Sequence, residues 1–164
     1  MTEQKRILLV CDSNHHYRAD IYELEFQGYD VTVAGEGGSL SVDDAISRII
    51  EDEEHFDLII SNMFMPCGND YLSLDGVNDG WTTGKAFVEF LRDEDVKTPF
   101  VFYDVSTGFM NCERYKSSKS TVGLENGDTI PVILRDGKLE EFILAIDNVI
   151  NKGDTPDSET HFTL

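Results

Sequence analysis

The stretch Phe56–Pro66 reads F-D-L-I-I-S-N-M-F-M-P. Its near-continuous apolar run is typical of a strand buried on both faces, as in a parallel sheet covered by helices. The run ends at Ser61 and Asn62, and Pro66 then fixes a loop. In open α/β sheets the functional loops lie beyond the carboxyl ends of the strands. The pattern therefore places Asn62 where a functional residue is expected.

Strand patterns alternate with helical patterns along the rest of the chain. Besides the central run, strands are predicted at Arg6–Val10, Tyr29–Ala34, Pro99–Tyr103 and Ile130–Leu134, and helices at His15–Gln27, Ser41–Ile50, Thr83–Arg92 and Lys138–Ile150. Gly28 closes the first helix as a C-terminal cap, and Ser41 with Asp44 predicts an N-terminal capping arrangement. Five strands joined mostly by short connections predict right-handed crossovers and a parallel sheet. We expect a three-layer α/β fold of the flavodoxin-like type.

Two segments lack such patterns. The segment Cys67–Gly80 is polar and Gly-rich and is predicted to be a long loop, and Val105–Gly127 is only weakly patterned, with at most a turn or two of helix. Residues 153–164 are predicted to be a frayed tail after a single domain at 1–152. Because loops carry function on a rigid scaffold, both loops are candidate functional segments. The weakly patterned one holds the only basic cluster, which is either a contact for an acidic partner or a solvated surface: Arg114, Lys116 and Lys119.

The composition restricts the function classes. The chain has 164 residues and a net charge of −19, and such a surface repels nucleic acids and anionic membranes. No apolar run approaches the length of a membrane span, and residues 1–6 are polar, unlike a signal peptide. Three cysteines without metal-type or redox-type pair spacing fit a reducing compartment. We therefore expect a cytoplasmic protein that binds neither nucleic acid nor membrane.

Three stretches together resemble the receiver domains of bacterial response regulators. They are R-I-L-L-V-C-D-S from Arg6, G-Y-D-V-T-V-A-G-E-G from Gly28 and D-L-I-I-S-N-M-F-M-P from Asp57. Their order and spacing are similar to those of the first three receiver strands, and the resemblance covers Arg6–Ile150. It implies a CheY-like parallel sheet of five strands in the order 2-1-3-4-5. It also implies a role in two-component signal transduction or a phosphorelay.

The positions that carry receiver chemistry are changed. The resemblance implies that Asn62 occupies the place of the phosphorylated Asp, and that Cys11 and Asp12 occupy the place of two acids that help to hold Mg²⁺. Three carboxylates have become one, so Asp12 is the single candidate ligand at a weakened metal site, and no other cofactor is expected. An amide is not a nucleophile that forms an acyl phosphate. The resemblance is therefore to a pseudo-receiver.

The switch positions differ as well. Asp104 stands where receivers have a Thr or Ser that hydrogen-bonds the phosphoryl group, and Arg135 stands where they have a Lys. The planar fork of Arg favours a carboxylate, so a permanent ion pair between Asp104 and Arg135 is one interpretation, and two solvated charges are the other. Val132 stands where receivers carry a switch-reporting aromatic residue. Both the phosphorylation site and the aromatic residue that reports phosphorylation in receivers are therefore missing.

These departures imply a stand-alone receiver that is not an enzyme and acts by binding proteins. The resemblance implies partners such as a histidine kinase, a phosphotransfer domain or another receiver, including a second copy of the chain. The alternative is a small flavodoxin-like enzyme or ligand sensor with a lidded pocket at the carboxyl edge of the sheet. That pocket would be lined by Asp12, Asn62, Asp104 and Arg135.

Two further alternatives remain at this edge. A soft-metal or thiol-redox site could combine several groups in or near these loops: Cys11, Cys67, Cys112, His15 and His16. Cysteines in such a chain also serve as small packing residues. Asn62 can likewise be a polar strand end that satisfies neighbouring backbone groups, and Asp12 a helix N-terminal acid.

Overall fold

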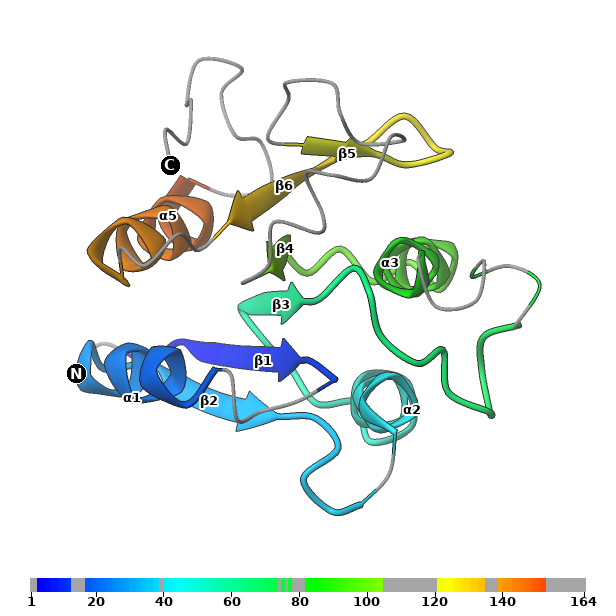
Figure 1. Cartoon of the computed structure of the whole chain (residues 1–164), viewed down its shortest axis with the longest axis horizontal. Helices are drawn as coiled ribbons and strands as arrows, with labels where there is room; N and C mark the ends of the chain where they lie inside the picture. The colour runs from blue at the N-terminus through cyan, green and yellow to red at the C-terminus, as the bar shows by residue number, and fades with distance from the viewer. Residues whose placement is uncertain are drawn as a thin grey trace.

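Six strands form the sheet in the computed structural model, in the order β2-β1-β3-β4-β6-β5 (Figure 1). Their bounds are β1 Arg6–Val10, β2 Asp30–Val33, β3 Leu58–Ser61, β4 Phe100–Asp104, β5 Thr121–Gly123 and β6 Thr129–Leu134. The structure describes residues 3–12, 17–38, 40–73, 75, 77, 82–104, 121–134 and 139–152, with the backbone alone at 104, 134, 141 and 152.

The parallel part of the sheet is the one that the sequence predicted. Strands β2, β1, β3, β4 and β6 are mutually parallel in that order, which corresponds to the expected order 2-1-3-4-5. The sheet has one strand more than the five expected. This additional strand, β5, pairs antiparallel with the outer side of β6. It has only three residues, Thr-Val-Gly, so it is too short to leave a period-two pattern in the sequence.

The helices lie in two layers. Helices α1, Arg18–Phe26, and α5, Leu139–Lys152, cover one face of the sheet, while α2, Ser41–Ile46, and α3, Thr83–Asp93, cover the other (Figure 1). Helix α2 continues as a π-helical turn over Ser47–Glu51. The arrangement is the three-layer α/β fold that the alternation of strand and helix patterns predicted. Within the described ranges, no helix combines the length and the apolar composition needed to cross a bilayer.

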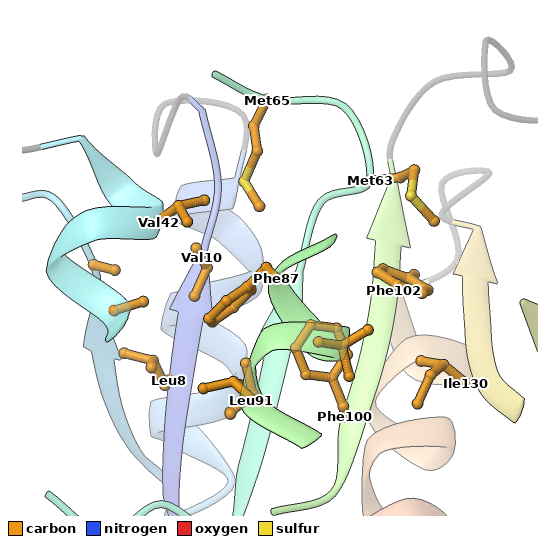
Figure 2. Packing of buried hydrophobic residues seen from close by; sticks show 14 of the residues in the cluster. Leu8, Val10, Val42, Met63, Met65, Phe87, Leu91, Phe100, Phe102 and Ile130 are labelled. Carbon is orange, nitrogen blue, oxygen red and sulfur yellow. The ribbon is translucent and has the colours of Figure 1, made fainter. Parts of the chain in front are cut away.

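Alternate side chains of each strand enter two separate cores. In β1, Ile7 and Leu9 pack toward α1 and α5, whereas Leu8 and Val10 pack toward α2 and α3. Figure 2 shows the second core, in which the residues of the sheet meet those of the helices: Leu8, Val10, Phe100 and Phe102 with Val42, Phe87 and Leu91. All four residues of β3 are buried, as expected for a strand covered on both faces.

The helix ends agree with one capping prediction and contradict the other. Gly28 has φ +96°, its N–H donates to the Glu25 carbonyl, and the Tyr29 N–H donates to the Leu24 carbonyl, which together form a Schellman C-cap. The predicted N-terminal capping by Ser41 and Asp44 is wrong. Ser41 is the first residue of the helix, so the N-cap position is Leu40, and no side chain makes a capping hydrogen bond there.

Each of those two side chains binds another segment instead. The Ser41 hydroxyl donates to the Cys11 carbonyl at 2.6 Å. The Asp44 carboxylate accepts the Gly35 N–H at 2.8 Å and the Arg48 Nε–H at 3.0 Å. The bonds to Cys11 and Gly35 join α2 to loops at the carboxyl edge of the sheet, whereas Arg48 lies in the π-helical turn that continues α2. The polar residues at the start of α2 are therefore used for tertiary contacts.

The described start of the long loop, residues 67–73, is fixed to α2 by Asp43. The buried carboxylate of Asp43 accepts the backbone N–H groups of Asn69 and Asp70, at 2.8 and 3.3 Å. Gly68 has φ +79°, and a Cβ there would lie 2.2 Å from Asp43 Oδ1. This part of the loop, predicted from its polar and Gly-rich composition, is therefore a built connection with no room for a larger residue at 68.

Candidate functional site

Asn62 lies at the carboxyl edge of the sheet, directly after β3. Its backbone N–H donates to the Val10 carbonyl at 3.0 Å, which extends the pairing of β3 with β1 by one residue. The residue is only 4% exposed. The sequence pattern placed Asn62 at this edge, but it did not indicate that the side chain would be shielded from solvent.

Three hydrogen bonds hold the Asn62 side chain. Its Nδ2 donates to the Tyr17 hydroxyl at 2.6 Å and to the Tyr103 carbonyl at 2.7 Å, and its Oδ1 accepts a long bond of 3.4 Å from the Asp12 N–H. Because a backbone carbonyl only accepts hydrogen bonds, the group that faces Tyr103 must be the amide NH₂. Both amide hydrogens are engaged, and an unprotonated carboxylate could not donate to the Tyr103 carbonyl.

Two tyrosines surround this amide. Tyr17, at the start of α1, is 3% exposed, and its ring lies 5.5 Å from that of Tyr103. Tyr103 in turn stacks on Phe142 of α5 at 4.4 Å, and its hydroxyl donates to Asp20 of α1 at 3.0 Å. The amide and the two tyrosines thus join the ends of β3 and β4 to the first turn of α1.

The sequence carried a signal for these contacts. Tyr17 shares the helical spacing of the apolar residues Ile21 and Leu24 in the first predicted helix, and a tyrosine hydroxyl needs a hydrogen-bond partner when it is buried. Asp20 was not singled out, although it lies three residues after Tyr17, on the same face of the helix as the apolar residues. A carboxylate on an apolar helix face indicates a buried hydrogen bond.

Cys11 and Asp12 differ in exposure. The side chain of Cys11 is 3% exposed, whereas that of Asp12 is exposed. Mg²⁺ prefers several oxygen ligands, mostly carboxylates and water. The described parts of the chain contain no group of three His, Cys, Asp or Glu residues placed to hold a metal ion. A buried thiol and a buried amide beside one carboxylate do not supply the several charged oxygen ligands that Mg²⁺ prefers.

Other predicted site residues fall partly outside the described residues. Asp104 ends β4, where its backbone is in register with Leu134 of β6. Its side chain and the whole of Arg135 lie outside the described part, so their ion pair remains a prediction. Cys67 is a buried free thiol that contacts the Gly68 carbonyl at 3.2 Å. Several other predicted groups also lie outside the described residues: Cys112, His15, His16, the cluster Arg114, Lys116 and Lys119, and the tail 153–164.

Helix α3 closes the site from the other layer. The Gly84 N–H donates to the Met63 carbonyl at 3.0 Å. A Cβ on Gly84 would lie 2.3 Å from the Asn62 carbonyl oxygen and 2.9 Å from the Met63 Cα. The first turn of α3 therefore packs directly on the backbone that carries Asn62, with no space between them.

A network of charges lies away from this site, at the start of β1. Arg6 at 2.8 Å and Arg48 at 3.0 Å bind the two carboxylate oxygens of Glu54. The Arg6 guanidinium, with a smaller contribution from Arg48, holds the pKa of the Glu54 carboxyl below its ordinary value, against the opposing effect of burial. This network joins α2 and its π-helical turn to the amino edge of the sheet.

No family model and no curated protein matches the chain. Solved structures do. The chain is similar to the receiver domain of Francisella response regulator 1452, at 16% identity and a TM-score of 0.56, over 91% of this chain and 98% of that one. It is also similar to the chemotaxis protein CheY4 of Vibrio cholerae, at 20% identity and a TM-score of 0.58, over 90% and 99%. A response regulator receiver protein from Sinorhizobium medicae WSM419 gives 16% identity and a TM-score of 0.60, over 92% and 98%.

These similarities run along nearly the whole of the compared receiver domains, and they agree with the sheet order found here. The chain therefore has the CheY-like receiver fold of response regulators, extended by the antiparallel strand β5.

Proposed function

We propose that this chain is a signalling protein of the receiver type that acts by binding another protein and does not accept a phosphoryl group. The observation that carries the proposal is the state of Asn62. Its side chain is buried, uncharged and hydrogen-bonded at both amide hydrogens. In the receivers that the chain resembles, the same position holds an Asp that must reach a phosphodonor.

The chemistry of phosphotransfer is unsupported at this position. An acyl phosphate needs a carboxylate nucleophile, and an amide does not supply one. The Tyr17 hydroxyl lies 2.6 Å from the amide nitrogen, so an incoming phosphoryl group would have to displace a buried aromatic side chain. The lack of a fitting Mg²⁺ site argues in the same direction, because a divalent cation neutralises the charge of the transferred group.

A receiver fold that is not phosphorylated has no switch between two conformations, so it presents the same surface to partners at all times. Partners of the kind expected from the resemblance are a histidine kinase, a phosphotransfer domain or another receiver. A chain of fixed conformation would act on such a partner as a constitutive adaptor or competitor. This output needs no catalytic residue in the chain itself.

Phosphodonor treatment tests the proposal. The purified chain is incubated with acetyl phosphate and Mg²⁺ and analysed by intact mass spectrometry, beside a receiver that has Asp at the acceptor position. We expect a phosphoryl adduct on the control receiver and none on this chain. An adduct on this chain that is lost at alkaline pH, as acyl phosphates are, would overturn the proposal.

A ligand sensor or enzyme is less well supported. The predicted pocket at the carboxyl edge contains Asn62, which Tyr17 covers. A separate cavity of about 700 Å³ lies between α2 and the start of the long loop, and four of its lining residues are acids: Asp43, Asp44, Glu51 and Asp70. Such a lining repels nucleotides and other phosphate-bearing ligands. A thermal-shift screen with metals and nucleotides tests this alternative, since a ligand that binds the folded state raises its melting temperature.

A further inference from the structure

The turn between β5 and β6 contains the single Asn-Gly pair of the sequence, Asn126–Gly127. Both residues are exposed, as are Glu125 and Asp128 on either side of them. Gly127 has φ +93°, and a Cβ there would meet no atom of the described residues within 4 Å, apart from its two chain neighbours. The backbone of the turn therefore favours glycine, which leaves the peptide nitrogen of Gly127 without a flanking side chain.

The Asn126 side chain folds back over this peptide. Its Oδ1 accepts the Asp128 N–H at 2.9 Å, and its Nδ2 donates to the Asp128 carboxylate at 2.9 Å. The first of these contacts closes a ring of atoms that includes both the side-chain Cγ of Asn126 and the nitrogen of Gly127. The amide carbon and the nitrogen that follows it are therefore held in one compact turn.

These two groups are the reactants of a self-modification. The Gly127 nitrogen gives its proton to a base of the solvent and attacks the Asn126 Cγ, which closes a succinimide ring. The Cγ–Nδ2 bond breaks, and the amide nitrogen takes up a proton and leaves as ammonia. Water then opens the ring at one of its two carbonyls, which leaves an aspartyl or an isoaspartyl residue at position 126.

One contact of the turn promotes this reaction. The attack is intramolecular, so the two reactants need not meet by diffusion. The Asp128 N–H points at the Oδ1 of Asn126, the atom on which negative charge develops as the nitrogen attacks. A donor placed at a developing oxyanion stabilises the transition state.

Another contact slows the reaction. The Gly127 N–H donates to the Leu124 carbonyl at 3.1 Å, and this bond must open before the nitrogen can attack. Residues 125–129 are all exposed, so water replaces the lost bond. Exposed turns open locally without unfolding of the domain. The reaction therefore proceeds from the folded protein, at a rate that includes the opening of this turn.

The product disturbs the hairpin. Asn126 now donates to the Asp128 carboxylate, whereas a carboxylate at position 126 would repel it. An isoaspartyl residue also adds a carbon to the main chain, inside the turn that the Leu124 N–H and the Asp128 carbonyl close at 2.8 Å. Strand β5 has only three residues, and this turn sets its pairing with Thr129–Pro131.

We propose that Asn126–Gly127 is a site of self-modification, where the loss of ammonia installs a negative charge that loosens the hairpin of β5 and β6. The change is covalent and one-way, and with time it frees the first half of β6 from its outer neighbour. It is independent of the proposed function, because neither a phosphoryl group nor a partner takes part.

Peptide mapping tests the modification. The full folded chain is incubated at mildly alkaline pH, digested with trypsin at intervals and analysed by mass spectrometry. The tryptic peptide 120–135 holds Asn126 as its only amide side chain, so its mass reports the conversion of that amide to an acid. The matched control is the peptide 139–152, with Asn148 and the exposed Asn151, neither of which precedes a glycine.

We expect the peptide 120–135 to lose its amide at least about tenfold faster than the control peptide. The rate should rise with pH, because a base removes the proton of the attacking nitrogen. The variant Asn126→Gln, whose side chain is one carbon longer and closes its ring less readily, should keep its amide over the same period.

A second variant tests the consequence. Asn126→Asp places the carboxylate of the product in the turn, and hydrogen exchange then measures how often the hairpin opens. We expect about fivefold faster exchange at the Leu124 N–H and the amides of β5, with no change in α1. The matched control is Asn151→Asp, which adds the same charge on α5 and should leave the exchange of β5 unchanged. Circular dichroism confirms that each variant is folded.

Three results would overturn this inference. One is a peptide 120–135 that keeps its amide in the folded chain while the same chain unfolded in urea loses it. Another is loss of the amide no faster than in the control peptide. The third is an Asn126→Asp variant whose β5 amides exchange at the parent rate. None of these bears on the acetyl phosphate test, which concerns Asn62, so the two proposals fail separately.

Discussion

Asn62→Asp restores the residue that the receiver family carries, and we expect it to destabilise this chain. The carboxylate would face the Tyr103 carbonyl, which lies 2.7 Å from Nδ2 in the structure, and it would have no hydrogen to donate to it. The side chain is 4% exposed, so water cannot replace the lost contact. The Tyr17 hydroxyl can turn and donate to the new carboxylate, which retains one of the two short bonds.

The magnitude follows from these contacts. The lost bond to Tyr103 costs about 1 kcal/mol, and the buried charge without a positive partner costs about 3 kcal/mol more. The sum is about 4 kcal/mol at neutral pH. For a chain of this length each kcal/mol lowers the melting temperature by about 2–4 °C, so we expect a decrease of about 8–16 °C.

The pH dependence identifies the cause. Burial and the facing carbonyl raise the pKa of the introduced Asp in the folded state, so folding disfavours its ionised form. The destabilisation is therefore fully present above the raised pKa and decreases as the pH falls toward about 4, the ordinary range of Asp. Thermal unfolding of the variant and the parent chain, followed by circular dichroism between neutral pH and about pH 4, measures this difference.

The matched control is Asn151→Asp, which adds the same charge at an exposed position of α5. It should change stability by about 0.5 kcal/mol or less at every pH. If Asn62→Asp melted within about 1 °C of the parent chain and showed no dependence on pH, the hydrogen bonds assigned to the Asn62 amide would be wrong.

Three further predictions concern the same contacts and their surroundings. Tyr17→Phe removes one acceptor from Asn62 and should lower the melting temperature by about 2–4 °C, or about 1 kcal/mol; an unchanged value would mean that the hydroxyl does not bind the amide. Gly84→Ala should lower the free energy of unfolding, measured by chemical denaturation, by about 2 kcal/mol, because the new Cβ meets the Asn62–Met63 backbone, even though Ala favours helices. The control Gly37→Ala, whose Cβ would lie in open space, should leave the free energy of unfolding unchanged. Glu54→Gln should lower the free energy of unfolding by about 1 kcal/mol at neutral pH, because Arg6 stabilises the ionised Glu54 and lowers its pKa. This difference from the parent chain should be lost as the pH falls below 4.5 and Glu54 of the parent chain becomes protonated. A difference that persists at low pH would contradict the assigned ion pairs.

The strands were predictable because burial on both faces leaves an apolar run. Arg6–Val10 has the predicted bounds, and the helix predicted at Thr83–Arg92 extends by one residue, to Asp93. The strand β5 could not be predicted, since its pairing depends on β6 and not on any pattern within Thr-Val-Gly. The helix was predicted to begin at Ser41, as α2 does, but its capping was mispredicted, because Ser41 and Asp44 have the residue types of a cap while their partners, Cys11 and Gly35, lie in other segments.

The candidate site was predictable in position and not in environment. A polar residue directly after a buried strand placed Asn62 at the carboxyl edge. Its burial results from Tyr17 and Tyr103, which come from two other segments. No pattern within one segment predicts how closely residues of other segments approach it. The same holds for Asp43, whose carboxylate binds a loop 26 residues further along the chain.

The hairpin formed by β5 and β6 has a consequence for how the molecule associates. Without it, the last parallel strand would offer a row of free backbone N–H and C=O groups along which another chain could extend the sheet. Here β5 pairs with Thr129–Pro131, the first half of that strand, while Val132–Leu134, the second half, pair with β4. Over Thr129–Pro131, another chain could therefore extend the sheet only by displacing β5, so encounters at this part of the rim are left to side chains.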